Sequence, residues 1–435
     1  MRRRLAVVTI GCKANFTDSA QIAALAARAG FQVVSETVPA DVLVVNSCTV
    51  THRADRDSRA FVRRLRRKNP EAVIILTGCY ARTAPGDRAR LPEANHWFGK
   101  DVMEELPGLL ASLSGDQADF ANAVPSLTAV NRLLGRTRTF LKIQDGCDCD
   151  CAYCIVPKAR GPGRSVPAEE IIESARQAER DGAREIVLTG IHAGRYGADR
   201  GEKDGLSVLL GRLLNAVSTC RFRIGSVEPL EITPPLVELI STQSRVCPHL
   251  HAPMQSGSDA VLRRMRRPYT FAVYREKLLS ISESMKYARI GADVMVGFPG
   301  ESASDFMETL SRIRELPLSY LHVFPYSPRA GTESAGWADD VAATEKKRRA
   351  NLLLAADKEM RVNYAKAQIG RTLSVIAESE YIKSGDREVK GLSENYLEVV
   401  FPSANAAVGE IFPVRIISER EGALEGMVAD ADKRD

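Results

Sequence analysis

Four of the nine cysteines in this chain fall within eight residues. The segment from residue 145 to 154 reads Asp-Gly-Cys-Asp-Cys-Asp-Cys-Ala-Tyr-Cys, with cysteines at 147, 149, 151 and 154. Thiolates at this density are typical ligands of soft metals, either zinc or an iron–sulfur cluster. A structural zinc site usually has a second close pair of cysteines or histidines, and no second Cys-x-x-Cys pair follows here. The pattern favours an iron–sulfur cluster, but four candidate thiols leave its ligand set open.

Three further cysteines are far apart in the sequence but occupy equivalent places. Cys12, Cys48 and Cys79 each lie just beyond a short apolar run, at residues 6–10, 42–45 and 72–76. Helical patterns over 19–28, capped by Thr17 or Asp18, and over 55–68 alternate with these runs. Such alternation predicts an α/β domain with a doubly wound parallel sheet. Because the carboxyl ends of parallel strands meet at one edge, the three thiols should converge there, unless they are merely buried small apolar groups.

A second α/β region follows. The N-terminal domain is expected over 1–115 and a linker over 116–138, which is rich in turn-forming residues. Beyond it, six strands and their helices predict a partial (β/α)6 barrel over 139–368, with its chemistry at the carboxyl ends of the strands. The expected strands are 140–144, 185–189, 222–227, 249–253, 288–298 and 320–326, and the expected helices are 168–180, 206–217, 235–241, 271–285, 305–316 and 343–367.

The C-terminal part differs from the rest in its pattern of apolar residues and in its charge. Short β-type runs at 373–377, 396–401, 410–417 and 423–428 predict a small five-stranded antiparallel β-barrel over 370–432. From residue 371 onward, 8 Lys and Arg stand against 13 Asp and Glu, whereas the remainder of the chain carries 52 against 42. A basic body with an acidic tail region predicts a polyanionic partner for the body alone.

The overall composition is that of a globular protein. Hydrophobic residues make up 44% and charged residues 26%, which excludes wholesale disorder. No apolar run approaches the roughly 18–20 residues of a membrane-spanning helix. The arginine-rich start runs into Gly11-Cys12 without a cleavage site for a signal peptide. An odd number of cysteines also argues against a secreted, disulfide-bonded protein. We therefore expect a cytoplasmic protein with no membrane partner.

The cysteine spacing resembles a known signature. Cys147-x-x-x-Cys151-x-x-Cys154, with Tyr153 before the last cysteine, is similar to the motif of radical S-adenosylmethionine (SAM) enzymes. Most of the chain further resembles the methylthiotransferases of that group, through residues 11–15, 46–51, 77–81, 155–161, 188–192, 226–229, 255–258 and 297–301. Within the family, residues 189–192, 249–251 and 321–327 are most similar to the branch that acts on N6-threonylcarbamoyladenosine (t6A) in tRNA.

The resemblance implies two [4Fe–4S] clusters. One would be held by Cys147, Cys151 and Cys154, with SAM on its open iron, and the second by Cys12, Cys48 and Cys79. The C-terminal barrel would correspond to a TRAM domain. The implied contacts to SAM come from residues near strand ends and from the cysteine loop, namely Tyr153, Thr189, Gly190, Ser226, Glu228 and Gln255.

The implied reaction adds a methylthio group to C2 of t6A at position 37 of tRNA anticodon loops. A 5′-deoxyadenosyl radical, made by reductive cleavage of SAM, would abstract the hydrogen at C2, and sulfur carried by the second cluster and methylated by a second SAM would then join that carbon. The implied partners are tRNA, SAM and a one-electron donor of the flavodoxin or ferredoxin type. The sequence marks no side chain as a catalytic acid or base, and it leaves the oligomeric state open.

Two positions depart from the family pattern. Cys149 stands where the family normally has a polar residue, which leaves the ligand set of the first cluster ambiguous, and Lys158 replaces a usual tyrosine. Two alternatives for the function also stand. The first is the same chemistry on another modified adenosine or on a ribosomal-protein aspartate, the latter because the acidic C-terminal region is compatible with a basic protein substrate. The second is a zinc-stabilised RNA-binding protein without enzymatic activity.

Basic side chains supply candidate contacts to RNA. One predicted helix and its entry carry Arg53, Arg56, Arg59, Arg63, Arg64, Arg66, Arg67 and Lys68, and a second basic run covers residues 263–267. Such runs suit phosphate contacts, although a solvated helix face is the simpler alternative. The carboxylate of t6A needs a charge-assisted partner, for which Arg160, Arg195 and Arg329 are candidates because each follows a predicted barrel strand.

Overall fold

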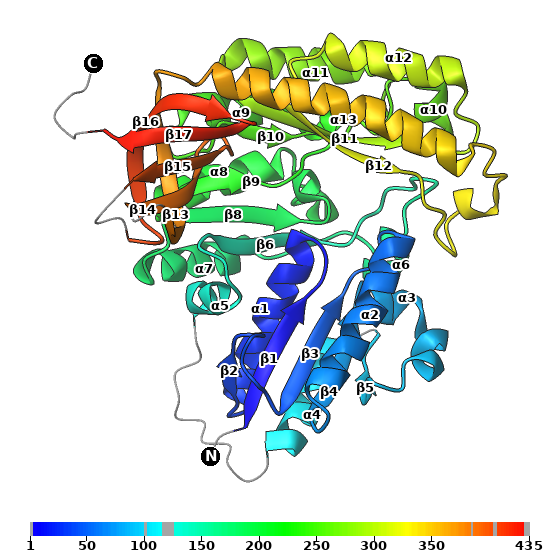
Figure 1. The fold of residues 1–435 in the computed structure, drawn as a ribbon, viewed down its shortest axis with the longest axis vertical. Helices are drawn as coiled ribbons and strands as arrows, with labels where there is room; N and C mark the ends of the chain where they lie inside the picture. The colour runs from blue at the N-terminus through cyan, green and yellow to red at the C-terminus, as the bar shows by residue number, and fades with distance from the viewer. Residues whose placement is uncertain (1–2, 100–101, 115–125, 384–385, 403–406, 430–435) are drawn as a thin grey trace.

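The computed structural model describes residues 3–99, 102–114, 126–383, 386–402 and 407–429. They form an N-terminal α/β domain, a central α/β region and a C-terminal ring of strands. Figure 1 shows the N-terminal domain beneath the central sheets and the ring at one end of them. Within these residues, no helix has the length and apolar character needed to cross a bilayer.

The N-terminal domain is a five-stranded parallel sheet with helices on both faces. The strand order is β2-β1-β3-β4-β5, and the inner strand β3 is buried along its whole length, as expected for a parallel sheet covered on both sides. One face packs on α1 and α4, the other on α2. The elements are β1 (Arg4–Thr9), α1 (Lys13–Arg28), β2 (Gln32–Val34), β3 (Val42–Ser47), α2 (His52–Lys68), β4 (Val73–Gly78), α3 (Cys79–Thr83), the 3₁₀ turn η1 (Pro85–Arg90), β5 (His96–Trp97) and α4 (Val102–Ser114).

Two boundaries differ from the sequence prediction. Helix α1 begins at Lys13, with Cys12 and not Thr17 or Asp18 at its N-cap. Asn15 and Phe16 are buried in this first turn, so packing extends the helix beyond its local capping signal. Residues 116–125 of the predicted linker lie outside the described part of the chain. Its later part is not a linker, because α5 (Leu127–Leu133) packs on α1 through Val130.

The central region contains two sheets whose strands run parallel, except where β6 meets the short β7. The orders are β7-β6-β8-β9 and β10-β11-β12, and single bridges Phe222–Val246 and Ser226–His251 connect them. The strands are β6 (Thr139–Asp145), β7 (Arg164–Ser165), β8 (Glu185–Gly190), β9 (Arg221–Ile224), β10 (His249–His251), β11 (Arg289–Val296) and β12 (Tyr320–Pro325). One apolar core fills the space between these sheets and their helices.

Six helices of the central region follow the predicted ranges closely, whereas the short helices α6 and α10 were not predicted. The α-helices are α6 (Val156–Arg160), α7 (Ala168–Arg180), α8 (Gly205–Ala216), α9 (Pro234–Thr242), α10 (Asp259–Arg264), α11 (Phe271–Ser284), α12 (Ala303–Arg314) and α13 (Ala343–Lys366). Short 3₁₀ turns complete the region at η3 (Ala193–Arg195), η4 (Ala198–Arg200), η5 (Pro229–Glu231) and η6 (Ser334–Gly336).

The C-terminal strands close into a ring in the order β13-β14-β15-β17-β16. They are β13 (Thr372–Lys383), β14 (Asp386–Ser393), β15 (Glu398–Pro402), β16 (Ile411–Arg420) and β17 (Ala423–Val428). Strands β15 and β17 pair in parallel, so the prediction of a wholly antiparallel barrel is wrong at this pair. Strand β14 lacks the apolar alternation that marks the other four in the sequence.

The ring docks on the edge where the central strands begin. Arg221 and Arg223 at the start of β9 donate to backbone carbonyl oxygens of the ring, and both pair with the buried Glu185 at the start of β8. On the ring itself, Glu378 and Glu410 pair with Arg138 and Arg184. Part of the acidity of the C-terminal domain therefore matches a basic docking edge. Figure 1 shows the ring at the end of the central sheets that is opposite the arrowhead of β8.

Candidate active site between two domains

A cavity of about 590 Å³ lies between the N-terminal sheet and the central sheets. We call it the cysteine cavity, because all seven cysteines singled out in the sequence line it. Its wall also contains residues from the ends of β8, β9, β11 and β12. The cysteines are Cys12, Cys48, Cys79, Cys147, Cys149, Cys151 and Cys154, and further lining residues include Asn15, Tyr153, Arg160, Gly190, His192, Ser226, Glu228, Gln255, Arg267, Asp293 and Arg329.

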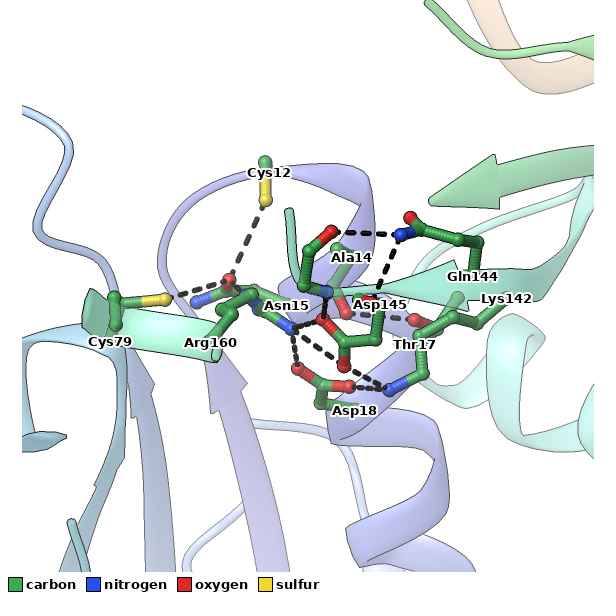
Figure 2. Close-up of polar contacts among 12 residues, drawn as sticks. Cys12, Ala14, Asn15, Thr17, Asp18, Cys79, Lys142, Gln144, Asp145 and Arg160 are labelled. Atoms are coloured by element: carbon green, nitrogen blue, oxygen red, sulfur yellow. Dashed lines mark hydrogen bonds and ion pairs between the residues drawn. The ribbon is translucent and has the colours of Figure 1, made fainter. Parts of the chain in front are cut away.

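Asn15 connects the three cysteine loops of the N-terminal domain. Its side-chain oxygen lies 3.5 Å from Sγ of Cys12 and 3.9 Å from Sγ of Cys79, as Figure 2 shows. Its amide nitrogen donates to the carbonyl oxygen of Ser47, beside Cys48, at 2.8 Å. The asparagine is fully buried. One side chain therefore holds all three loops at the edge where the parallel strands end.

Gly11 allows the Cys12 loop to approach Cys48. Its φ is +123°, a conformation that residues with a side chain rarely adopt. A Cβ at this position would lie 2.8 Å from Cβ of Cys48 and 3.1 Å from its Sγ. Any larger residue would push the two thiols apart.

Arg160 links the same set of thiols to the central region. It donates to the side-chain oxygen of Asn15 at 2.7 Å and pairs with Asp18 and Asp145 at 3.0 and 3.1 Å, and Figure 2 shows this network. Lys142 also pairs with both carboxylates. Because its charge is used in these contacts, Arg160 is a poor candidate for binding a substrate carboxylate.

The dense cysteine loop follows β6 and faces the second sheet. The backbone N–H of Cys149 donates to Sγ of Cys147 at 3.4 Å, and Nδ1 of His192 lies 3.4 Å from the same sulfur and 3.7 Å from Sγ of Cys149. A hydrogen bond from Cys149 lowers the pKa of Cys147, and the same contact raises the pKa of Cys149 to about 12. Cys147 is therefore the readier of the two to act as a thiolate ligand.

The cysteines that line the cavity are suitable ligands for an iron–sulfur cluster, which binds them as thiolates. Burial raises the pKa of Cys48 and of Cys154 from the ordinary 9.0 to about 11, so a metal must displace their protons to bind. Arg267 donates to Sγ of Cys151 at 3.4 Å, and Arg160 lies beside Cys79. Cationic neighbours compensate the charge of thiolates in an enclosed site. Two thiol sets with an open cavity between them fit two iron–sulfur clusters.

Most of the expected SAM contacts line this cavity. Ser226 is exposed in it, and Tyr153 packs edge-on against Phe298. The side-chain oxygen of Gln255 is buried and has no hydrogen-bond partner within the described residues, and the φ of Gln255 is +63°. An unpaired buried acceptor on a strained backbone is typical of a ligand site.

The last two expected SAM contacts, Thr189 and Gly190 at the end of β8, differ in whether they line the cavity. Gly190 lines the cavity, and a Cβ there would lie 3.0 Å from the carbonyl oxygen of Gln144. Thr189 is buried inside β8 and is not among the lining residues. The close approach of backbone expected at this strand end is therefore available at Gly190 and not through the side chain of Thr189.

Sequence reasoning missed the role of Arg267. This arginine belongs to the basic run that we assigned to RNA. In the structure its side chain is buried against Cys151 and forms an ion pair with Glu228. Nothing in the sequence distinguishes it from its exposed neighbours Arg263 and Arg264. Glu228, expected to meet a ribose, is thereby held in place by a cation that also touches the cysteine loop.

The basic helix α2 divides its side chains between two uses. Arg59, Arg63 and Arg66 bind groups of their own domain, such as the phenol oxygen of Tyr80 and the carbonyl oxygens of Arg90 and Glu93. The others, Arg53, Arg56, Arg64, Arg67 and Lys68, are exposed. The helix begins directly after the Cys48 loop, so this exposed basic face lies on the element that follows the cavity wall.

The other residues singled out in the sequence, Arg195, Arg329 and Lys158, lie in different surroundings. Arg195 is exposed and does not line the cysteine cavity. Arg329 does line it and is buried. Lys158 is exposed, and its Nζ lies 3.0 Å from where a Cβ on Gly331 would be. The structure offers no explanation for the replacement of a tyrosine by Lys158.

Two family models match separate parts of the chain. Residues 4–99 match the model of uncharacterized protein family UPF0004, and residues 141–313 match that of the radical SAM superfamily. The fold is similar to that of the radical S-adenosylmethionine methyltransferase TsrM from Kitasatospora setae. Its TM-score is 0.53 at 13% identity, covering 75% of this chain and 77% of that one.

Several relatives match nearly the full length of this chain. The chain is 36% identical to the threonylcarbamoyladenosine tRNA methylthiotransferase MtaB of Bacillus subtilis, over 97% of this chain and 96% of the relative. It is 31% identical to the tRNA-2-methylthio-N(6)-dimethylallyladenosine synthase of Dictyoglomus thermophilum, over 97% of this chain and 98% of the relative.

Proposed function

Because this chain belongs to the radical SAM tRNA methylthiotransferases, we propose that it adds a methylthio group to C2 of N6-threonylcarbamoyladenosine at position 37 of tRNA. The enzyme is a transferase that uses SAM and [4Fe–4S] clusters, so the non-enzymatic alternative is excluded. The observation that carries the proposal is the cysteine cavity, because thiols from both domains line one space.

Six cysteines hold the two clusters in this proposal. Cys147, Cys151 and Cys154 hold one, and Cys12, Cys48 and Cys79 hold the other, with SAM bound at the first. When bound and reduced, the first cluster supplies the electron that cleaves SAM. Cys149 donates its backbone N–H to Cys147 and acts as a neighbour of the cluster, not as a ligand.

The protein residues orient the reactants and exclude water. Gly190 lets the methionyl part of SAM approach the backbone, and the unpaired oxygen of Gln255 accepts a hydrogen bond from it. Ser226 and Glu228 bind the ribose hydroxyls, with Arg267 fixing Glu228, while the ring of Tyr153 forms the apolar part of the wall. Thr189 supports this end of β8 from inside the sheet. Such positioning leaves the difficult chemistry to the cofactors.

Two observations favour an RNA substrate with a t6A base. The exposed basic face of α2 suits phosphate contacts near the cavity, where an adenine from a single-stranded anticodon loop can be splayed out. The identity to the threonylcarbamoyladenosine enzyme of Bacillus subtilis, 36%, exceeds the 31% to the dimethylallyladenosine enzyme of Dictyoglomus thermophilum, while the threonylcarbamoyladenosine enzyme of Rickettsia prowazekii also stands at 31%.

The domains divide the work in the same proposal. Residues 1–115 carry the second cluster, and 139–368 form the radical SAM partial barrel, in which single bridges join the two sheets. Residues 370–432 form a TRAM-like domain. The electron comes from a donor of the flavodoxin or ferredoxin type. A tRNA substrate favours the cytoplasm as the compartment of the reaction.

Mass spectrometry of tRNA nucleosides from cells with and without the gene tests the proposal. We expect 2-methylthio-t6A to disappear and t6A to accumulate when the gene is deleted. Loss of the methylthio derivative of isopentenyladenosine instead would assign the enzyme to the other tRNA branch. Unchanged tRNA with loss of methylthio-aspartate in a ribosomal protein would contradict an RNA substrate.

A further inference from the structure

Arg329 differs from the other two candidate arginines, because it lines the cysteine cavity and part of its guanidinium has no hydrogen-bond partner among the described residues. Arg160 uses its guanidinium on Asn15, Asp18 and Asp145, and Arg195 lies outside the cysteine cavity. The side chain of Arg329 is only 8% exposed and lines the cavity. Its Nη2 donates to Oγ1 of Thr49 at 2.6 Å and to Oδ2 of Asp55 at 2.7 Å.

Two nitrogens of this buried guanidinium have no hydrogen-bond partner. Within the described residues, neither Nε nor Nη1 of Arg329 meets an acceptor. Buried donors are nearly always paired, and a buried donor without a hydrogen bond destabilises the folded protein. An arginine that is anchored at one nitrogen and unpaired at the other two is preorganised to receive an anion from the cavity.

The surrounding wall fixes Arg329 in this position. Thr49 also donates to Oδ1 of Asp55 at 2.7 Å, so the carboxylate is held on both oxygens. The backbone N–H of His52 donates to Oγ of Ser327 at 3.3 Å, which joins the start of α2 to the same loop. Residues of both domains therefore form one wall, and it holds a guanidinium that is paired with Asp55 through Nη2 and has no partner at Nε and Nη1 among the described residues.

The wall also has an apolar part. Phe324 and Pro325, at the end of β12, line the cavity together with Val50, which is 52% exposed. A flat base with a short carboxylate side group matches an apolar surface that ends in a fixed guanidinium. The isopentenyl group has no acceptor and would leave both donors of Arg329 unpaired.

We propose that Arg329 binds the carboxylate of the threonyl group of t6A and thereby determines which modified adenosine the enzyme accepts. This inference rests on the proposed function. Asp55 and Thr49 are positioning residues that hold the guanidinium. A site built to pair a polar substrate group rejects an analogue that lacks it, because its own buried groups then stay unpaired.

Binding of anticodon stem-loop RNA to the anaerobically purified holoenzyme tests this assignment. Two RNAs are compared, one with t6A and one with unmodified adenosine at position 37. We expect the wild type to prefer the t6A RNA by on the order of 10-fold or more. Arg329→Gln should lose this preference while keeping its affinity for unmodified RNA, and Arg329→Lys, which keeps the charge, should retain part of it.

A matched arginine supplies the control. Arg82 also joins the two domains, through a hydrogen bond from Nη1 to the carbonyl oxygen of Ala159 at 2.7 Å, but it does not line the cysteine cavity. Arg82→Gln should keep the preference for t6A. Equal losses for both RNAs in Arg329→Gln would show a merely structural role and overturn the assignment, as would a preserved preference or a wild type without one.

A product assay separates failure of the inference from failure of the function. The same proteins are reduced and given SAM with each RNA, and with RNA bearing isopentenyladenosine. If the wild type methylthiolates t6A and Arg329→Gln does so equally well, the inference alone fails. If the wild type acts on isopentenyladenosine and not on t6A, the proposed function fails together with the inference.

Discussion

Two buried arginines lie at opposite edges of the central sheets. Arg223, at the edge where the strands begin, is fully buried, and all three of its side-chain nitrogens are paired with Glu185 or with carbonyl oxygens of the C-terminal ring. Arg329, beyond the end of β12, is nearly as buried, but two of its nitrogens are unpaired within the described residues. The first arginine closes an interface, whereas the second faces a cavity.

The difference shows how one fold separates stability from chemistry. In β/α architectures, reactive groups gather where strands end, and the opposite edge serves stability. Here the beginning edge is sealed by the docked ring, while the ending edge carries the thiols and the unpaired Gln255 oxygen. Substitutions at the two edges should therefore have different readouts.

The largest effect is expected from a cluster ligand at the open edge. Cys151→Ser removes a proposed ligand and should lower reductive SAM cleavage by about 100-fold or more, since changes to mere outer-shell neighbours already cost 10–100-fold. Cys149→Ser is the matched control within the same loop and should retain SAM cleavage. Formation of 5′-deoxyadenosine by the reduced protein gives the readout. The reverse pattern would mean that Cys149 replaces Cys151 as a ligand.

A large loss of stability is expected at the sealed edge. Glu185→Gln leaves Arg221 and Arg223 without their buried counter-ion and should lower the free energy of unfolding by about 3–5 kcal/mol. The thermal midpoint is the measurement, and Glu173→Gln, in an exposed pair with Arg180, should leave it unchanged. An unaltered midpoint in Glu185→Gln would remove the contrast between the edges.

The same carboxylate gives a pH dependence with a definite sign. Although burial opposes its ionisation, Arg223 and Arg221 hold the pKa of Glu185 well below the ordinary 4.5. A depressed folded-state pKa contributes stability above the unfolded-state value and loses it as the pH falls through the folded one. The difference in free energy of unfolding between the wild type and Glu185→Gln should thus be constant above about pH 5 and become smaller in acid.

A smaller effect, confined to one cluster, is expected for Asn15. Asn15→Ala removes the side chain that contacts Cys12 and Cys79 and should weaken iron binding at that set by about 10–100-fold. Iron per chain should fall from about eight toward about four, while SAM cleavage persists. Chemical iron and sulfide analysis with electron paramagnetic resonance provides the measurement. Loss of both clusters together would show that the two sets do not assemble independently.

The smallest effect is expected for Gly11. Gly11→Ala introduces a Cβ at a φ of +123° and 2.8 Å from Cys48, which should destabilise the folded protein by about 1–2 kcal/mol. Gly86 has no atom within 4 Å of its would-be Cβ, so Gly86→Ala is a suitable comparison and should be nearly neutral. Equal thermal midpoints for the two variants would contradict a tight Cys12–Cys48 approach.

The sequence predicted the elements better than the contacts between them. Convergence of Cys12, Cys48 and Cys79 follows from strand order alone, and the structure brings the three thiols to one cavity. The start of α1 was missed because Cys12 at its N-cap makes no side-chain capping bond. Strand β14 was missed for want of apolar alternation, and α5 because turn-forming residues precede it.

Individual side chains within the site were the least predictable part. The choice of Arg329 over Arg160 depends on Asp55, which is 274 positions away in the sequence, and on Asn15, which is 145 positions from Arg160. Arg267 could not be separated from a run of exposed arginines. Such distinctions arise from contacts between residues far apart in the sequence, and no local pattern encodes them.

The two thiol sets of the cysteine cavity are expected to perform separable halves of one reaction. Cys48→Ser tests this separation, with 5′-deoxyadenosine and methylthiolated RNA measured in the same incubation of reduced protein, SAM and t6A-containing tRNA. We predict that the variant still cleaves SAM but forms no methylthio product. Methylthio product from Cys48→Ser, or loss of SAM cleavage in a variant that keeps its iron at Cys147, Cys151 and Cys154, would contradict the account.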